Sequence, residues 1–244
     1  MLDERPKIEQ AVRAVCSREE MAVTHLPTDH AGGKWRLRYE SASGGGGTLE
    51  VDLNFMFRVS LWPVRPLDSR RVGSSAVAGI PVLDIHELAA GKLAALLSRH
   101  ASRDLFDAHR LLTTQQLESE QLRLAFVVYG AMNRRDWREV QAEDVDFEAK
   151  EMRDHLLPTI RRHFLATLSD PDNWARDLVA RCRAALQCVL PLRPHEKDFL
   201  NRLLDYGEIK AGLLTNDKPL ADRIASHPLI QWKAINVQQH RSRS

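Results

Sequence analysis

The chain has 244 residues, of which 43% are hydrophobic and 28% charged, a balance typical of a soluble globular protein with one large or two small domains. The formal net charge of +2 gives no overall attraction to nucleic acid or to a membrane surface. The three cysteines form no CxxC pair and have no zinc spacing, and the chain shows neither a signal peptide nor a long apolar run, so we expect a cytoplasmic protein.

The first part of the chain predicts a small α+β region. Residues 6–19 carry apolar side chains at helical spacing, which indicates an amphipathic helix. Residues 34–39 and 48–57 alternate between apolar and polar side chains, as strands with one buried face do. The glycine-rich residues 41–47 lie between these strands and predict a hairpin connection, because a phosphate-binding glycine loop would open a helix instead.

The rest of the chain predicts mainly helices. Residues 61–79 contain two prolines and two glycines without a sustained period, so we expect a long connection with one edge strand, then a short strand over residues 80–83. The expected helices span residues 85–100, 102–112, 116–133, 147–168, 172–189, 193–206 and 218–239, the last broken near His227 and Pro228. The expected fold class is α+β, with an α+β core in residues 1–84 and a helical domain in residues 85–244.

One helix contains a lysine where an aliphatic side chain is usual. On a helix beginning at Ile85, Lys92 falls in the middle of the stripe formed by Ile85, Leu88, Ala89 and Leu96. Such a lysine could snorkel to solvent, pair with one carboxylate, or act as a fixed cation for a phosphate. Its position alone leaves these interpretations open.

The next helix offers a carboxylate in its first turn. Asp104 follows Ser102, a suitable N-cap, and acids at this position are commonly structural. Asp104 could also bind Mg²⁺ or accept a proton. Asp107, one turn later, is expected to be solvated or to pair with Arg103 or Arg110.

Asp52 and three pairs of adjacent arginines each allow a functional and a structural interpretation. Asp52 lies on the polar face of its predicted strand, where it could serve the same site or pair with Arg36 and Arg38 across the hairpin. Adjacent arginines at residues 70–71, 134–135 and 161–162 could contact phosphates, although a solvated face explains each pair as well. The sequence contains no HExxH, GxSxG or GxGxxG motif, so these zinc, hydrolase and dinucleotide sites are not indicated.

The chain resembles the AbiEii/AbiGii toxin family of nucleotidyltransferases. The resemblance rests on DIHELAAGKLAALLSRHASRDLFDAHRLL, in which the lysine, the twelve-residue step to the next acid and the RDxxD sequence match the family signature. Two further segments are similar to the strand hairpin and the C-terminal helical tail of that family: GGKWRLRYESASGGGGTLEVDLNFMFRVSLW and LLDYGEIKAGLLTNDKPLADRIASHPLIQWKAINV.

The resemblance implies a polymerase-β-like nucleotidyltransferase core and the toxin half of a type IV toxin–antitoxin, phage-defence (abortive-infection) pair. It implies Mg²⁺ as cofactor and a nucleoside triphosphate (NTP), an RNA or protein acceptor and a cognate antitoxin as partners; related toxins modify RNA, notably tRNA 3′ ends. By position, Lys92 would bind triphosphate oxygens, Asp104 would be the catalytic carboxylate of the second helix, and Asp52 a third-strand carboxylate. Asp52 and Asp104 would be the metal ligands.

The chain departs from the family pattern at its start. The family normally opens with a Gly-Gly or Gly-Ser turn and a strand bearing Asp-x-Asp, and no such segment precedes Pro6, so we expect an N-terminally incomplete toxin. Two alternatives remain open. The chain could be a catalytically inactive remnant that only binds antitoxin or RNA, or a helical scaffold in which the charged hairpin is purely structural.

Overall fold

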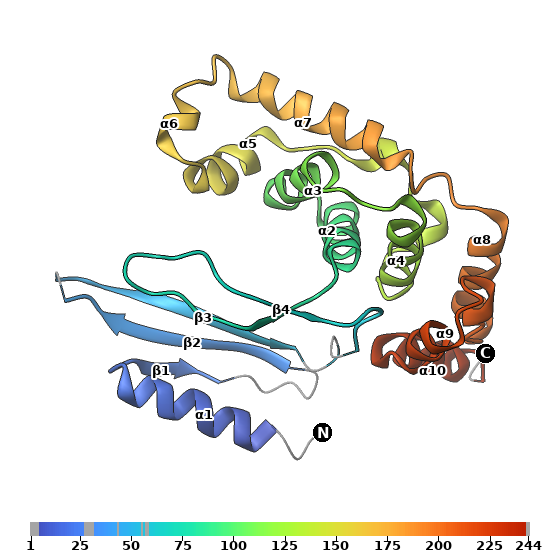
Figure 1. Ribbon diagram of the computed structural model, residues 1–244, viewed down its shortest axis with the longest axis horizontal. Helices are drawn as coiled ribbons and strands as arrows, with labels where there is room; N and C mark the ends of the chain where they lie inside the picture. Colours follow the sequence, from blue (N-terminus) through green and yellow to red (C-terminus); the bar gives the residue numbers. More distant parts are fainter. Residues whose placement is uncertain (1–4, 27–31, 43, 55, 57–58, 243–244) are drawn as a thin grey trace. The chain divides into compact units, whose positions relative to one another are not determined.

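The computed structural model describes residues 5–26, 32–42, 44–54, 56 and 59–242. Contacts divide the chain into two compact units, Met1–Arg58 and Val59–Ser244, and each unit has its own hydrophobic core. Figure 1 shows a sheet with one helix in the first unit and many helices in the second. The predicted α+β class is confirmed. The predicted domain boundary between residues 84 and 85 stays a prediction.

The first unit consists of one helix and a three-stranded antiparallel sheet. Its elements are α1 (Arg5–Arg18), β1 (Ala22–His25), β2 (Gly32–Glu40) and β3 (Gly46–Asn54), and the strand order is β1-β2-β3. Alternation along β2 turns Trp35 and Leu37 inward, where they are buried together with Cys16 of α1. The predicted helix and both predicted strands are confirmed, although Phe55 and Phe57, which the prediction placed in the second strand, lie outside the described residues.

The glycine-rich segment forms the hairpin turn between β2 and β3, as predicted. Gly44 and Gly45 have φ angles of +89° and +83°, in the left-handed region that favours glycine. The Ser41 N–H donates to the carbonyl of Gly45 at 2.8 Å, and the Gly44 N–H donates to the carbonyl of Ser41 at 2.9 Å. These bonds close the turn at the end of the sheet.

The second unit begins with a two-stranded ribbon and continues as helices. β4 (Arg65–Leu67) pairs antiparallel with β5 (Ile80–Val82), which confirms the predicted edge strand and short strand. The helices are α2 (Ile85–Arg99), α3 (Ser102–Thr114), α4 (Ser119–Ala131), α5 (Ala149–Glu151), α6 (Arg162–Leu165), α7 (Pro171–Leu186), α8 (Pro194–Asn201), α9 (Lys218–Ser226) and α10 (Pro228–Arg241). α2 packs against α3 and α4, and α3 packs against α7 (Figure 1).

The single long helix predicted over residues 147–168 is wrong. The chain there forms α5, a wide π-type turn over Met152–Leu156, a 3-10 turn over Leu157–Thr159 and then α6. Pro158 explains the break, because its nitrogen carries no N–H and its ring clashes with the carbonyl of the preceding turn. The chain therefore turns a corner before α7 begins.

Close packing in the second unit depends on one glycine. The rings of Phe126 and Trp137 are fully buried, with their centroids 5.0 Å apart. A Cβ atom on Gly130 would lie 2.0 Å from Nε1 of Trp137, so only glycine lets the indole lie against α4. This contact joins the segment after α4 to the main core.

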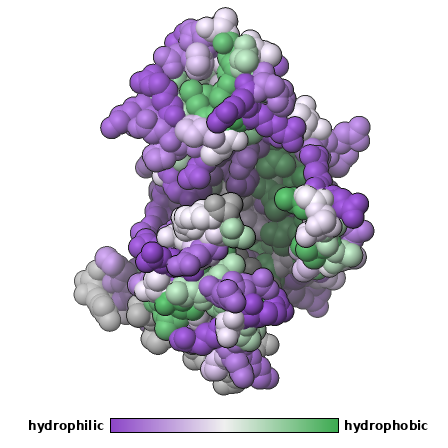
Figure 2. Space-filling model, turned by 90° about the vertical axis from the view of Figure 1, so that its left-hand side faces the viewer, coloured by the Kyte–Doolittle hydropathy of each residue, from purple (hydrophilic) through white to green (hydrophobic). Residues whose placement is uncertain are grey.

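The end of the second unit that carries α6 presents both apolar and polar side chains. Phe164 is 39% exposed there and its ring lies 5.7 Å from that of Trp174. Figure 2 shows hydrophobic side chains gathered at this end, at the top of the view, with hydrophilic ones around them. Among the described residues, no helix has both the length and the apolar character needed to cross a membrane.

Candidate active site

The hairpin of α2 and α3 carries two of the three predicted site residues. α2 begins after Asp84, whose carboxylate accepts the N–H of His86 at 2.9 Å. It ends at Arg99, and its C-cap, His100, adopts a left-handed conformation with φ 54° and turns the chain into α3. Since the two helices pack against each other, side chains from both line the hairpin.

Lys92 does not lie in the middle of a buried stripe, contrary to the prediction. The face of α2 that packs into the core is formed chiefly by Ala89, Ala90, Leu93, Leu96 and Leu97, so Ala89 and Leu96 of the predicted stripe are buried. Lys92 lies beside this face, and its side chain is 45% exposed. The lysine therefore avoids most of the desolvation penalty that a buried ammonium group carries.

Lys92 pairs with an acid on the facing helix. Its Nζ lies 2.7 Å from Oδ2 of Asp107, whose side chain is 43% exposed. The pair lies in a groove of about 360 Å³ between α2 and α3, which is also lined by Leu88, Arg110 and Leu111. Sequence reasoning gave Asp107 other partners, although its place one turn after Asp104 puts it within reach of the facing helix.

Asp104 is buried and held by an arginine at the end of α2. Its side chain is 6% exposed, and the guanidinium of Arg99 donates to Oδ2 at 2.8 and 3.1 Å and to Oδ1 at 3.0 Å. Ser102 is the first residue of α3 and not its N-cap, which is Ala101, and its N–H donates to Glu151 at 2.7 Å. The two predicted residues of the hairpin thus have different partners.

Asp52 lies on β3 of the first unit, in a ladder of charged side chains. The strand register places Asp52 opposite Lys34 and Glu50 opposite Arg36. Lys34 Nζ lies 2.9 Å from Glu50 and 3.9 Å from Asp52, and Arg36 Nε donates to Glu50 at 3.1 Å. Hydrogen bonds from Lys34 and Arg36 lower the pKa of Glu50. Glu50 thus forms the two short contacts of the ladder, whereas the side chain of Asp52 remains 66% exposed.

The described residues do not bring together a donor set for Mg²⁺. Within residues 5–26, 32–42, 44–54, 56 and 59–242, no three His, Cys, Asp or Glu side chains converge on a metal position. Both carboxylate oxygens of Asp104 already accept hydrogen bonds from Arg99. Metal binding by Asp52 and Asp104 therefore stays a prediction.

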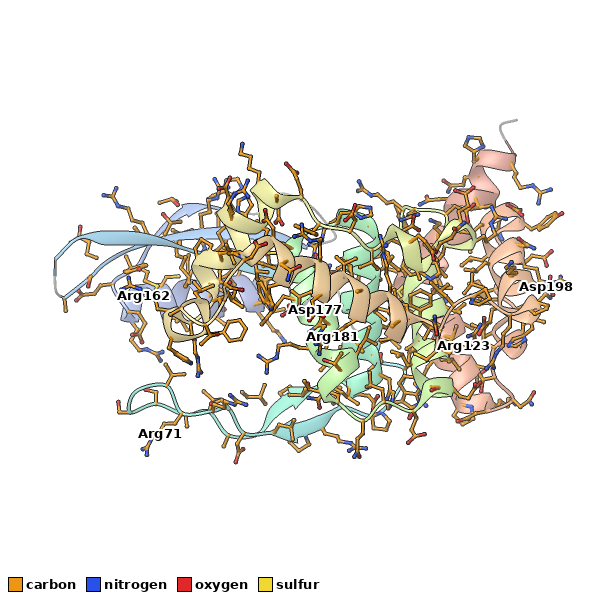
Figure 3. The ribbon with its side chains drawn as sticks, turned by 90° about the horizontal axis from the view of Figure 1, so that it is seen from above. Arg71, Arg123, Arg162, Asp177, Arg181 and Asp198 are labelled. Atoms are coloured by element: carbon orange, nitrogen blue, oxygen red, sulfur yellow. The ribbon has the colours of Figure 1, made fainter. Side chains whose placement is uncertain are left out.

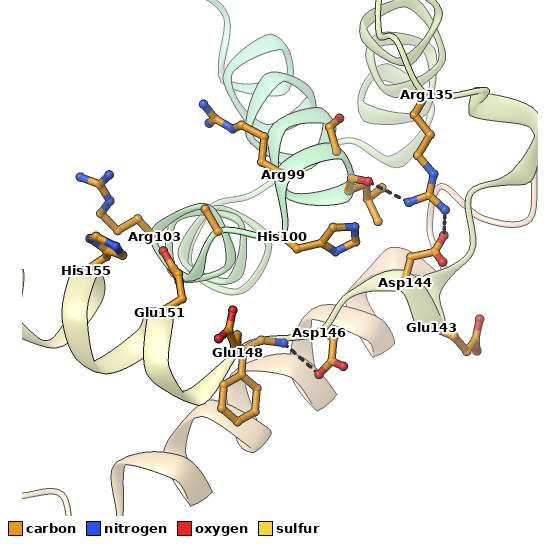
Figure 4. A pocket seen from close by; sticks show the side chains of 14 residues that line it. Arg99, His100, Arg103, Arg135, Glu143, Asp144, Asp146, Glu148, Glu151 and His155 are labelled. Carbon is orange, nitrogen blue, oxygen red and sulfur yellow. Dashed lines mark hydrogen bonds and ion pairs between the residues drawn. The ribbon is translucent and has the colours of Figure 1, made fainter.

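A larger hollow, of about 1160 Å³, lies at the corner between α2 and α3 (Figure 4). Its walls carry cations such as Arg99 and Arg103 and anions such as Asp144 and Glu148. Arg135 donates to the carbonyl of Leu97 at 2.8 Å and to Asp144 at 2.6 Å. The lining residues come from segments far apart in sequence, which explains why no local motif indicated them.

Comparisons with known proteins give one family and one similar structure. The family model described as nucleotidyl transferase AbiEii toxin, type IV TA system, matches residues 2–188. MenT4, a nucleotidyltransferase toxin from Mycobacterium tuberculosis H37Rv, is similar with a TM-score of 0.50 and 14% identity, over 84% of this chain and 66% of that one. This likeness concerns the fold alone, and the chain spans about two thirds of the length of MenT4. No curated protein matches the chain.

Proposed function

The chain belongs to the AbiEii family of type IV toxin nucleotidyltransferases, and from this membership we propose that it transfers a nucleotide from an NTP to a hydroxyl group. We propose RNA, of the tRNA kind, as the first acceptor to test and a protein hydroxyl as the second. We also propose that the protein binds a cognate antitoxin, acts in phage defence and is cytoplasmic.

The observation that carries the proposal is the half-exposed Lys92 in the groove between α2 and α3. Its ammonium group is fixed by one carboxylate at 2.7 Å, yet remains open to solvent. An ammonium group has three donors, so Lys92 can contact phosphate oxygens while it keeps its bond to Asp107. This arrangement supports a role for Lys92 in binding the triphosphate.

The chemistry follows from the reaction class. The acceptor oxygen forms a bond to the α-phosphorus while the bond from that phosphorus to the leaving oxygen breaks, and pyrophosphate departs. The hydroxyl proton passes to a base, for which Asp104 is the predicted group. Lys92 neutralises negative charge on the phosphoryl oxygens as it develops. Arg99 fixes the orientation of the Asp104 carboxylate through its two-pronged contact.

The direct test incubates the full chain with each radiolabelled NTP, Mg²⁺ and total tRNA, and follows the label on a denaturing gel. We expect labelled RNA from the wild type and a loss of about 100-fold or more in rate for Lys92→Ala. Lys150→Ala, which removes an exposed lysine on α5, is the matched control and is expected to label normally.

Two results would contradict the proposal in different ways. No label in RNA or protein with any NTP would argue against nucleotidyl transfer by this chain and for the alternative of a protein that only binds. Full labelling by Lys92→Ala would show that the chain is active and that Lys92 is not part of the active site.

A second variant tests the groove itself. Asp107→Asn removes a negative charge beside the proposed triphosphate position, so NTP binding should become tighter, by about two- to fivefold for a half-exposed charge. Lys92→Ala should weaken NTP binding, which isothermal titration with a non-hydrolysable NTP analogue can measure for both variants. Weaker binding by Asp107→Asn would mean that the acid, and not only the lysine, is needed to hold the nucleotide.

A further inference from the structure

The ribbon that opens the second unit extends into solvent along almost its whole length. Every residue from Pro63 to Ile80 is exposed except the half-buried Ser69. Leu67, Val72 and Val77 are 54%, 79% and 59% exposed. A two-stranded ribbon that buries so little contributes little to the stability of the unit, so another use is expected of it. We call residues 63–80 the arm.

The shape of the arm is fixed by its own hydrogen bonds. Beyond the paired strands β4 and β5, the N–H of Ser69 donates to the carbonyl of Val77 at 2.8 Å, and the N–H of Gly79 donates to Asp68 at 2.9 Å. At the tip, Val72 and Ser75 exchange hydrogen bonds of 2.9 and 3.1 Å around Gly73, whose φ is +60°. The arm is therefore an ordered element and presents its side chains in a defined place.

The arm carries more positive than negative charge. Arg70 and Arg71 lie next to the tip, and both side chains are exposed. The nearest acid in sequence, Asp68, already accepts the N–H of Gly79. Neither arginine forms an ion pair with any described residue, so both guanidinium groups keep their donors for a ligand.

A second pair of arginines lies at the same end of the second unit. Arg161 and Arg162, at the start of α6, are exposed, and neither forms an ion pair within the part of the chain that the structure describes. Figure 3 shows Arg162 and Arg71 at the same end of the unit, and the arm and α6 share that end in Figure 1 as well. Arg70, Arg71, Arg161 and Arg162 together are called the cationic end.

We propose that the cationic end binds the phosphodiester backbone of a structured RNA, and that it positions the acceptor for the reaction proposed above. The inference rests on the proposed function only for the acceptor role, since binding itself needs no nucleotide transfer. Arginine forks match phosphate oxygens in pairs, and double-stranded RNA is recognised mostly through its shape, its phosphates and its 2′-hydroxyl groups. The net charge of the chain is only +2, so four arginines without ion-pair partners at one end make a local positive field.

The experiment measures binding of the full chain to a fluorescently labelled RNA stem-loop by anisotropy, without NTP, over a series of salt concentrations. Each phosphate contact releases counterions, so the slope of log K against log salt concentration reports the number of contacts. We expect Arg70→Ala/Arg71→Ala to reduce the slope by about 1.4 to 1.8 and to weaken binding at least tenfold at low salt. Arg161→Ala/Arg162→Ala should have a similar effect.

The matched control removes the same charge from arginines that already have partners. Arg181 pairs with Asp177 at 2.8 Å and Arg202 pairs with Asp198 at 3.3 Å (Figure 3 labels Arg181 and both acids). Arg181→Ala/Arg202→Ala should leave the slope unchanged. The variants of the cationic end should keep the thermal midpoint and NTP binding of the wild type, because its four arginines are exposed and have no ion-pair partners among the described residues.

The outcomes separate this inference from the proposed function. An unchanged slope in the cationic-end variants, or an equal change in the control, overturns the inference even if the wild type labels RNA. Loss of binding to the antitoxin alone, with RNA binding intact, overturns it too and assigns the cationic end to a protein partner. Salt-dependent RNA binding that the variants lose, without any labelling, supports the inference while the proposed function fails.

Discussion

Lys92 shows how a charged residue is accommodated on a helix of the core. The buried face of α2 passes beside the lysine, and Asp107 of the facing helix supplies its partner at 2.7 Å. An ion pair exposed by more than two fifths on both sides adds little to stability. A ligand can therefore compete with this ion pair at little cost to stability, which is compatible with the phosphate contact proposed for Lys92.

Glu87, on the same helix, is the opposite case, because its carboxylate is needed by the fold. It is 1% exposed and accepts the N–H groups of Leu61 at 2.8 Å and Trp62 at 3.1 Å, together with the hydroxyl of Tyr129 at 3.1 Å. Burial raises the pKa of Glu87, and the hydrogen bonds offset only part of that shift. This carboxylate ties the start of the second unit to α2.

The raised pKa of Glu87 predicts a pH dependence of stability. Because the folded state binds the proton more tightly than the unfolded state, this contribution is complete below about pH 4.5 and is lost as the pH rises through the folded pKa. In the Glu87→Gln variant the side chain cannot titrate, and its amide N–H faces a backbone N–H donor. We therefore expect a free energy of unfolding about 1 to 3 kcal/mol below that of the wild type. Urea unfolding at several pH values measures the difference in free energy of unfolding between wild type and variant. This difference should become smaller as the pH rises.

The Glu50→Gln variant is the control, because its stability difference from the wild type should change with pH in the opposite direction. Lys34 and Arg36 lower the pKa of Glu50, so its contribution is present above about pH 4.5 and is lost as the pH falls through the folded pKa. The gap between wild type and Glu50→Gln should therefore widen, slightly, as the pH rises. If the stability difference between wild type and Glu87→Gln also increased with pH, burial would not be the dominant influence on the pKa of Glu87.

At the scale of elements, the sequence predicted what is local and missed what depends on distant partners. α2 and α3 begin at the predicted residues, Ile85 and Ser102, because their apolar spacing is strong over three turns or more. β1 was not predicted, since four mostly exposed residues give no alternation. Gly130 gave no sign in sequence of the close approach of Trp137, which comes from a separate segment.

The candidate site follows the same division. Spacing and resemblance placed Lys92 and Asp104 on one hairpin, and the structure has them there. Their partners were not predicted, because which face of α2 is buried depends on where α4 packs, and no pattern in α2 alone contains that information. The roles of Lys92, Asp104 and Asp52 stay predictions.

One buried ion pair joins two helices of the second unit. Arg123 of α4 donates to both oxygens of Glu196 of α8 at 2.6 and 2.9 Å, and the two side chains are 7% and 4% exposed. The same guanidinium donates to the carbonyls of Cys188 and Pro191 in the segment between α7 and α8. Arg123 thus satisfies the buried carboxylate of Glu196 and two backbone carbonyls of the connecting segment at once.

Removing Arg123 should destabilise the second unit strongly. Arg123→Met leaves the Glu196 carboxylate buried with a single backbone donor, the N–H of Arg193 at 2.6 Å, so we expect a loss of about 3 to 5 kcal/mol in the free energy of unfolding. The measurement is urea denaturation followed by far-ultraviolet circular dichroism.

Two further variants test whether the buried charge is the cause. Arg202→Met removes a solvent-exposed pair with Asp198 and should change stability little. Arg123→Met/Glu196→Leu removes both charges and should recover much of the loss. A double variant as unstable as Arg123→Met alone would mean that packing, and not the unpaired carboxylate, sets the cost.

At the scale of the whole molecule, the two units have cores of very different size. Three side chains, those of Cys16, Trp35 and Leu37, make the buried core of Met1–Arg58 in its described part. The buried core of Val59–Ser244 draws on every long helix from α2 to α10. Chains of about 60 residues bury a smaller fraction of their surface on folding than chains near 190 residues do, and they are correspondingly less stable.

We therefore expect residues 59–244 to fold without the first unit. The fragment should unfold cooperatively, with a thermal midpoint within about 5 °C of that of the full chain, since its core is complete. A fragment of residues 1–58 should give no cooperative transition, because three buried side chains cannot offset the entropy of ordering a helix and three strands. Circular dichroism melts of both fragments and the full chain make the comparison.

Tryptophan gives this experiment an independent readout. Trp35 is the single tryptophan of residues 1–58 and is fully buried, so its emission reports burial in that fragment. A red-shifted emission maximum in the fragment, equal to that in urea, is expected if the first unit is unstable alone. A blue-shifted maximum with a cooperative transition would show instead that the hairpin and α1 fold unaided, and that the small core is sufficient.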